Sequence, residues 1–150
     1  MLNRKVIHES SSPYNYYGLY FNKNSKQIRG IPCLVINYKP LNNVLADDTY
    51  SIPHKGNLIT RIVGSKVFSK FEMKSEFWQV SIKEDDQFKT DFSIPSRCYE
   101  WSVIPFGLKH APSKFQKVMD QVFKPYFDWL IVYIDDILVF SKSVDEHFKH

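Results

Sequence analysis

The segment from residue 129 to 140 reads WLIVYIDDILVF, an apolar run with two adjacent aspartates at its centre. A buried carboxylate without a partner is costly, and two like charges side by side cost more. The flanking stretches LIVYI and ILVF have the composition of β-strands, and two residues separate them, which is hairpin spacing. The segment therefore predicts a β-hairpin whose tip carries Asp135 and Asp136.

The two aspartates allow two interpretations. Aspartate is a common turn residue, so the pair could be ordinary turn chemistry, although two-residue hairpins prefer Asn-Gly or Asp-Gly. Alternatively, carboxylate oxygens are the natural ligands of a hard cation such as Mg²⁺, which would neutralise the adjacent charges. Two such ions, about 3.5–4 Å apart, are a common device for in-line phosphoryl transfer. The rigid apolar flanks favour this second interpretation.

A two-metal site needs a further carboxylate from elsewhere in the chain. Glu72 ends a predicted strand, KVFSKFEM at 66–73, and Glu76 lies across the turn that follows. The acidic stretch at 84–86 is a weaker candidate, because it reads as the loop of a hairpin between predicted strands at 78–82 and 88–95. Glu72 and Glu76 are therefore the preferred candidates.

The remaining pattern mixes strands and helices irregularly, which predicts an α+β fold. Residues 8–30 are polar and read as irregular or weakly paired strand. Further strands are predicted at 33–38 and 99–105, and helices after Pro53, over 112–124 and from Ser143, the start of a capping box.

Composition limits the functional classes. The chain has 150 residues, 43% hydrophobic, which suits one domain or part of a larger one. Residues 1–46 contain six basic residues and one acidic residue, which suits nucleic acid, although a solvated lysine-rich surface explains the same count. The two cysteines lie far apart, which predicts no disulfide-linked partner and no zinc site. The sequence has neither a signal peptide nor an apolar span of about 20 residues, which predicts an intracellular protein without a membrane partner.

Four blocks occur in order: VFSKFEMKSEFWQVSI, FKTDFSIP, YEWSVIPFGLKHAPSKFQKVMD and VYIDDILVFSK. They resemble the successive motifs of the reverse transcriptases of plant pararetroviruses (Caulimoviridae) and gypsy-type retrotransposons, and LVINYKPLN at 34–42 is similar to the fingers motif before them. The resemblance runs from about residue 30 to the end. It implies a right-hand polymerase fold with fingers and a partial palm.

The resemblance also implies roles for individual residues. Tyr133 to Asp136 would form the palm hairpin, with both aspartates and Glu72 at the metal site. Phe92 would pack under the nucleotide sugar, and the nucleotide site would also include Asp91, Phe106, Gly107 and Tyr133. The expected cofactor is a pair of Mg²⁺ ions, and the expected partners are an RNA or DNA template with its primer and dNTPs.

Four positions depart from the family pattern. Glu72 replaces an aspartate, and the added methylene displaces the carboxylate by more than the roughly 0.5 Å that such sites tolerate. Glu76 replaces a glycine, and Asp91 replaces alanine or glycine beside the expected triphosphate. Cys33 replaces a fingers arginine, which removes a bidentate phosphate donor. Together these changes predict a copy that is inactive or strongly impaired.

The chain is therefore expected to be a partial reverse transcriptase domain over 1–150, with a basic N-terminal or fingers part at 1–46 and a fingers–palm core at 47–150. The family's thumb and RNase H domain are expected to be missing, which suggests the remnant of a viral element or retrotransposon integrated in a plant genome. Three alternatives stay open: an active polymerase completed by another chain, a nucleic-acid-binding module without chemistry, and a metal-dependent nuclease.

Overall fold

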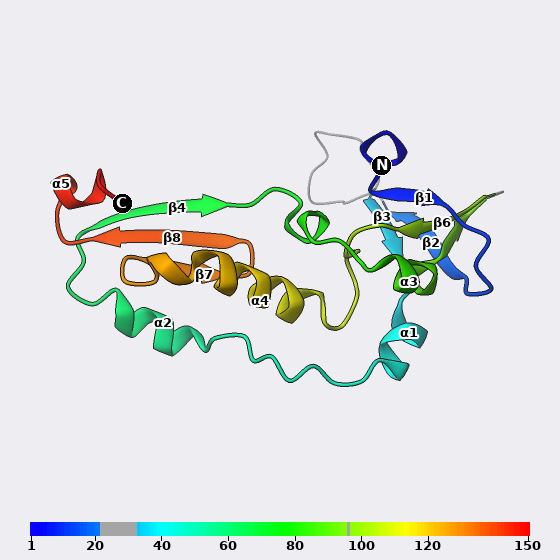
Figure 1. Ribbon diagram of the computed structural model, residues 1–150, viewed down its shortest axis with the longest axis horizontal. Helices are drawn as coiled ribbons and strands as arrows, with labels where there is room; N and C mark the ends of the chain where they lie inside the picture. The colour runs from blue at the N-terminus through cyan, green and yellow to red at the C-terminus, as the bar shows by residue number, and fades with distance from the viewer. Residues whose placement is uncertain (22–32, 96) are drawn as a thin grey trace. The chain divides into compact units, whose positions relative to one another are not determined.

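The computed structural model describes residues 1–21, 33–95 and 97–150 (Figure 1). The chain divides into two compact units. Unit 1 consists of Met1–Ala46 and Phe77–Ala111, and unit 2 of Asp47–Glu76 and Pro112–His150. The N-terminal 46 residues are thus grouped with a segment that follows much later in the sequence. Three of the basic residues predicted to favour nucleic acid, Lys23, Lys26 and Arg29, lie outside the described residues.

Unit 1 is built on a five-stranded sheet in the order β1-β6-β5-β2-β3. The strands are β1 (Ile7–Glu9), β2 (Tyr16–Phe21), β3 (Cys33–Ile36), β5 (Phe92–Ile94) and β6 (Arg97–Trp101). Strand β2 pairs with β3 in antiparallel and with β5 in parallel orientation. The short helices of this unit are η1 (Leu2–Arg4), α1 (Lys39–Val44), α3 (Glu84–Gln87) and η3 (Phe88–Thr90), while η2 (Glu76–Gln79) begins at the boundary.

Aromatic side chains fill the core of unit 1. Phe92 is 1% exposed, and its ring centroid lies 5.9 Å from that of Tyr99 and 5.7 Å from that of Trp101. Tyr38 is equally enclosed, and its hydroxyl donates to the carbonyl of Thr90 at 2.7 Å. These rings explain why the sheet holds together although its strands are short, because each buried aromatic removes a large apolar area from water.

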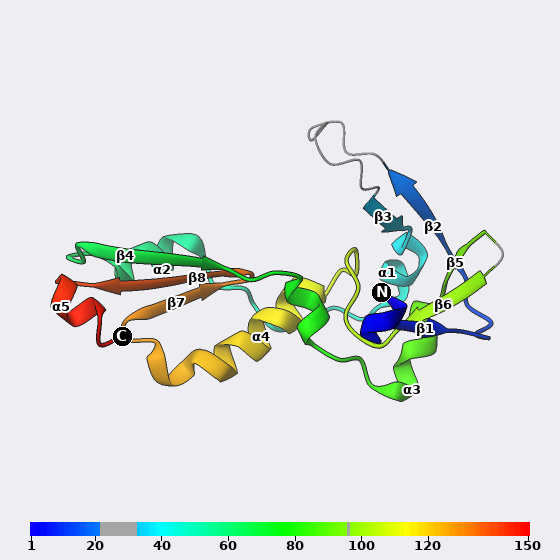
Figure 2. The ribbon, with the colours of Figure 1, turned by 90° about the horizontal axis from the view of Figure 1, so that it is seen from above.

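Unit 2 contains a three-stranded antiparallel sheet in the order β4-β8-β7. Its strands are β4 (Val67–Glu72), β7 (Leu130–Tyr133) and β8 (Asp136–Ser141), and its helices are α2 (Lys55–Arg61), α4 (Ala111–Phe123), η4 (Lys124–Tyr126) and α5 (Val144–His147). Figure 2 shows α4 running beside β7. Phe115 and Met119 of α4 are buried, as are Leu130, Ile131 and Val132 of β7. The apolar face of α4 is therefore buried at Phe115 and Met119, as its 3.6-residue period predicts, whereas Val122 on the same face is 57% exposed.

The α+β fold class is confirmed, and so are the strand at 66–73, the helix over 112–124 and the Ser143 cap, whose hydroxyl accepts from the N–H of Glu146 at 3.2 Å. The predicted strand at 78–82 is wrong. Residues 76–79 form the 3₁₀ helix η2, and only Ser81 makes an isolated bridge, to Val103. Residues 84–86 are likewise not a hairpin loop but the acidic first turn of α3, where negative charge stabilises a helix N-terminus.

No helix in the described ranges is long and apolar enough to cross a membrane.

Candidate metal and nucleotide site

Strands β7 and β8 form the predicted hairpin, but its turn lies one residue earlier than expected. Tyr133 pairs with Asp136, so the two turn residues are Ile134 and Asp135. Ile134 has a φ of 54°, in the left-handed region. Asp135 therefore lies in the turn, whereas Asp136 is the first residue of β8. The expectation that both aspartates form the tip is corrected accordingly.

Strand β4 brings the third predicted carboxylate to the same end of the sheet. Glu72 lies directly opposite Asp136 in the β4–β8 pairing. The N–H of Met73, the next residue, donates to the carbonyl of Asp135 at 2.9 Å. Cross-strand partners point to the same face of a sheet, so Glu72, Asp136 and Tyr133 share one face. Glu76, the other candidate, begins η2 and lies outside this pairing.

A lysine that the sequence interpretation missed occupies this site. The Lys70 Nζ atom lies 2.9 Å from Asp136 Oδ1, with both side chains partly exposed. The hydrogen bond to Asp136 raises the pKa of Lys70, and the charges of Asp136, Glu72 and Asp135 add to the rise. The signal was present in the sequence, because residues two apart on a strand share a face and Lys70 precedes Glu72 by two.

The donor chemistry suits a hard divalent cation, since all three groups are carboxylates. The side chains are not gathered around a common point, however. In the described part of the chain, no three His, Cys, Asp or Glu side chains are grouped so that they could hold a metal ion. The backbone thus aligns the predicted ligands, while the Asp136 carboxylate is engaged with Lys70.

Tyr133 is the one predicted nucleotide contact that lies on unit 2. Lys55 Nζ of α2 is 5.2 Å from the centroid of its ring, within the range of a cation–π contact.

The other predicted nucleotide residues lie on unit 1. Gly107 has a φ of +93°, which explains why glycine suits this position. Its carbonyl accepts from Asn42 Nδ2 at 2.9 Å, and Asn42 Oδ1 accepts from the N–H of Lys109 at 2.8 Å. Phe106 is 48% exposed and meets the ring of Phe77 edge-on at 5.1 Å. The fingers motif at 34–42 and the loop that contains Phe106 and Gly107, far apart in the sequence, are therefore joined through Asn42.

Asp91 and Phe92 are both buried in unit 1. Asp91 is 0% exposed, and neither carboxyl oxygen accepts a well-formed hydrogen bond among the described residues. Burial raises the pKa of Asp91, and the charge of Glu100 adds to the rise while the Ser10 hydroxyl opposes it. Cys33 begins β3, opposite Phe21.

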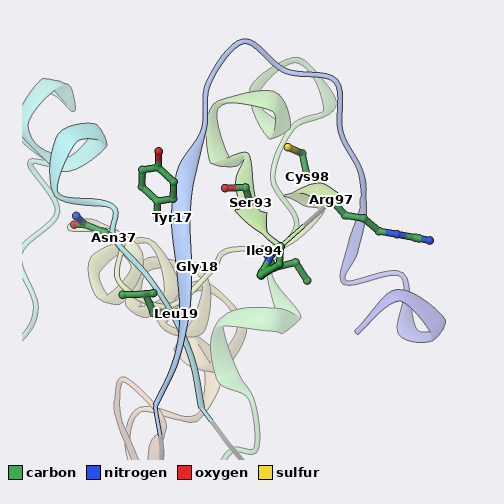
Figure 3. A pocket seen from close by; sticks show the side chains of 9 residues that line it. Tyr17, Gly18, Leu19, Asn37, Ser93, Ile94, Arg97 and Cys98 are labelled. Carbon is green, nitrogen blue, oxygen red and sulfur yellow. The ribbon is translucent and has the colours of Figure 1, made fainter.

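Unit 1 also carries a pocket of about 800 Å³ formed by residues of β2, β5 and β6 (Figure 3). Tyr17, Leu19, Arg97 and the free Cys98 are among its lining residues. It contains none of the residues predicted to bind metal or nucleotide.

Comparison with known proteins identifies the family. The family model described as reverse transcriptase (RNA-dependent DNA polymerase) matches residues 21–150. The chain is 48% identical over 144 residues to the genome polyprotein of Petunia vein clearing virus (isolate Shepherd), covering 96% of the chain and 7% of the polyprotein. It is 43% identical over 150 residues to the enzymatic polyprotein of Cauliflower mosaic virus (strain Strasbourg), covering 100% of the chain and 22% of that polyprotein. The chain thus spans less than a quarter of the relatives' length.

Solved structures show the same fold. The native prototype foamy virus protease-reverse transcriptase matches with a TM-score of 0.86 at 22% identity, covering 99% of this chain and 19% of that one. The foamy viral enzyme in complex with an RNA/DNA hybrid matches with the same TM-score at 24% identity, with the same coverage. The resemblance to pararetroviral polymerases and the fingers–palm fold are therefore confirmed. This chain belongs to the reverse transcriptase (RNA-dependent DNA polymerase) family.

Proposed function

We propose that this chain supplies the fingers and palm of an RNA-directed DNA polymerase, and that catalysis by this copy is strongly impaired. The observation that carries the proposal is the strand register that places Glu72 opposite Asp136, beside the turn residue Asp135. Unit 1 corresponds to the fingers with adjoining palm residues, and unit 2 to the rest of the palm. The boundary predicted at residues 46 and 47 stays part of this proposal.

Asp135, Asp136 and Glu72 would hold Mg²⁺. When bound, two such ions supply charge stabilisation to the attacking and leaving oxygens of a phosphoryl transfer. The residues of this chain would place the carboxylates at the end of the hairpin. Phe106 and Gly107 of unit 1, and separately Tyr133 of unit 2, would contact the nucleotide. For Phe92 and Asp91, which are 1% and 0% exposed, nucleotide contact stays a prediction of the resemblance.

The proposed partners are an RNA or DNA template with its primer and dNTPs. Membership of the family supports this, as do the solved foamy viral enzymes in complex with double-stranded DNA and with an RNA/DNA hybrid. The net charge of +4 is consistent with a polyanionic partner.

The proposed impairment rests on Glu72 first. Its side chain is one methylene longer than the aspartate that the family motif carries, and a misplacement of about 1 Å can reduce a rate on the order of 100-fold. The Lys70–Asp136 ion pair adds a competitor for one of the remaining carboxylates. Asp91 is the third factor: its buried, titratable carboxyl group lies immediately before Phe92, which is predicted to pack under the nucleotide sugar.

Primer extension on an RNA template with Mg²⁺ tests the proposal. We expect the full chain to extend near background and Glu72→Asp to increase extension on the order of 10- to 100-fold. Asp135→Asn in the Glu72→Asp background serves as the control and should return extension to background. Equal extension, above background, by the original chain and Glu72→Asp would disprove the impairment. If neither extends but both bind an RNA–DNA duplex in a salt-dependent way, the non-catalytic nucleic-acid-binding function is favoured.

A further inference from the structure

The turn that carries Asp135 is held in a conformation that its own residues do not favour. Ile134 has a φ of 54°, where a β-branched side chain is disfavoured. Its N–H, which lies outside the strand pairing, donates to Gln116 Oε1 of α4 at 2.7 Å. A helix far away in the sequence therefore fixes the backbone of the turn.

Gln116 can serve the turn in only one orientation of its amide. The side chain is fully buried, and its Nε2 donates to Asp120 Oδ1 at 2.8 Å and to the carbonyl of Val132 at 3.2 Å. A reversed amide would set its NH₂ group against the N–H of Ile134 and its oxygen against a carboxylate and a carbonyl. Asp120 thus helps to select the orientation that the turn requires.

Asp120 is fixed in turn from the strap, which we define as residues 47–54, before α2. The Tyr50 hydroxyl donates to Asp120 Oδ2. Burial, followed by the contact with Asp120, raises the pKa of Tyr50 to about 12. The hydroxyl therefore keeps its proton and stays a donor throughout the neutral range.

Asp48 anchors the strap to the first turn of α4. Its carboxylate accepts from the Ser113 hydroxyl at 2.8 Å and from the N–H of Tyr50 at 3.1 Å, and lies 3.3 Å from Lys114 Nζ. These contacts, led by that of Ser113, lower the pKa of Asp48 to about 2. The carboxylate is thus ionised near neutral pH, and Tyr50 is held at a defined place along the helix.

We propose that Tyr50 and Asp120 are positioning residues for the carboxylate-bearing turn, and that they act through Gln116. The hydrogen bonds run without a break from Tyr50 to Asp120, to Gln116 and to Ile134. The strap and α4 thereby set the backbone from which Asp135 and Asp136 project. The significance for metal binding and catalysis rests on the proposed function, but the positioning of the turn does not.

The alternative to a positioning role is that Tyr50 only packs the strap onto α4 and contributes to the overall stability of unit 2. The two explanations differ in what a lost hydroxyl does at a distance. If the chain of hydrogen bonds from Tyr50 through Asp120 and Gln116 positions the turn, removal of the Tyr50 hydroxyl changes hydrogen exchange at the Ile134 amide specifically. This change then occurs only while Asp120 is present. If Tyr50 only adds stability, all amides of unit 2 respond together.

The experiment is amide hydrogen exchange by ¹⁵N NMR on the full chain without metal. Tyr50→Phe removes the hydroxyl and keeps the ring, and Tyr126→Phe, at a tyrosine of the same unit that is 45% exposed, is the matched control. We expect Tyr50→Phe to speed exchange of the Ile134 amide about tenfold, as for one weakened buried hydrogen bond, and to shift the Gln116 side-chain amide signals. Tyr126→Phe should leave both unchanged.

A double-mutant cycle completes the test. Asp120→Ala should speed exchange at Ile134 by a similar factor, and adding Tyr50→Phe to it should have no further effect there. Additive effects, an unchanged Ile134 amide in Tyr50→Phe, or an equal acceleration at amides throughout β4 and β8 would each overturn the inference. Because no readout requires polymerisation, failure here is distinguishable from failure of the primer-extension test.

Discussion

The Lys70 side chain contacts one of the carboxylates that are proposed to bind metal. It lies on the same strand face as Glu72, and its ammonium group contacts the Asp136 carboxylate at 2.9 Å. An ammonium ion and a divalent cation compete for the same oxygen atoms. The lysine therefore offsets the charge of the Asp136 carboxylate, and a metal ion bound at the proposed site would have to displace it.

Removing this competitor should favour metal binding. We expect Lys70→Met to increase the affinity for Mn²⁺, measured by isothermal titration calorimetry, by about two- to fivefold, the worth of a partly exposed ion pair. Lys74→Met, which removes an exposed positive charge just after β4, is the control for the general change in charge. Affinity that is unchanged or lower in Lys70→Met, relative to the control, would show that the ion pair does not compete.

For Asp91, the motif predicts a functional role, but it does not predict that the side chain is buried. The sequence places it beside the expected triphosphate, and that role stays a prediction. The structure adds that its carboxyl is fully buried in unit 1. No pattern within the segment signals this burial, because the core of unit 1 is built from residues at distant positions in the sequence, such as Tyr38 and Trp101.

At the scale of elements, periodic segments were predictable and aromatic clusters were not. The strand composition of β4 and the 3.6-residue face of α4 follow from patterns within one segment. Residues 78–82 have strand-like composition, yet Trp78 lies in a 3₁₀ turn, where its ring meets Trp101 at 6.0 Å and Phe106 at 6.2 Å. Tertiary packing of these rings overrides the local propensity.

The position of the hairpin turn was predictable only to within one residue. Its sequence lacks the Asn-Gly or Asp-Gly signal that would fix the register. The turn at Ile134 and Asp135 is instead stabilised by contacts from other elements, namely Gln116 of α4 and Met73 after β4. Such contacts between distant segments leave no local signal.

Helix α2 is attached to the start of β7 through one side chain. The Arg61 guanidinium donates to the carbonyls of Phe127 and Leu130, the latter at 2.9 Å, and its Cζ lies 5.5 Å from the centroid of the Phe127 ring. Charged donors to carbonyls contribute more than neutral ones. Arg61 therefore satisfies carbonyl groups where the chain enters the sheet.

We expect Arg61→Met to lower the free energy of unfolding of unit 2 by about 1–2 kcal/mol, because two carbonyls lose a charged donor. Denaturant titration followed by fluorescence would measure this loss. Arg61→Lys, which keeps the charge but can donate to fewer acceptors at once, should recover part of it. Lys117→Met, at an exposed position of α4, should change stability by less than about 0.5 kcal/mol. A loss no larger than that of Lys117→Met would contradict the attachment.

At the scale of the molecule, the order of the motifs predicted the family and the fold, whereas the interleaving of the two units was not predictable. Residues 1–46 join 77–111 through pairings such as Ile7 with Trp101. Nothing in either segment indicates its partner, because strand pairing across such a separation depends on the whole fold. The resemblance could supply the fold class but not these contacts.

Asp91 of unit 1 and Asp48 of unit 2 should contribute to stability in opposite ways as the pH falls. In unit 1, burial raises the folded-state pKa of Asp91, so the folded form binds the proton more tightly than the unfolded form. The Asp91 contribution to stability is therefore most favourable below the unfolded value of about 3.9, and becomes less favourable as pH rises through the folded pKa. In unit 2, the folded-state pKa of Asp48 is lowered to about 2, so its contribution is present above about 3.9 and is lost as pH falls towards 2.

Hydrogen exchange of each unit between pH 2 and 7 would separate the two effects. Relative to wild type, Asp91→Ala should stabilise unit 1 at pH 7 and should do so less as pH falls to 4, because the protonated carboxyl costs less to bury. Asp48→Ala should destabilise unit 2 above pH 4 and have little effect near pH 2. Lys89 lowers the pKa of Asp86 in unit 1, so the contribution of Asp86 to stability changes with pH in the same direction as that of Asp48. This contribution is the same in wild type and Asp91→Ala, so it drops out of the difference between them. An Asp91→Ala effect that is constant over this range would show that the carboxyl does not titrate with a raised pKa.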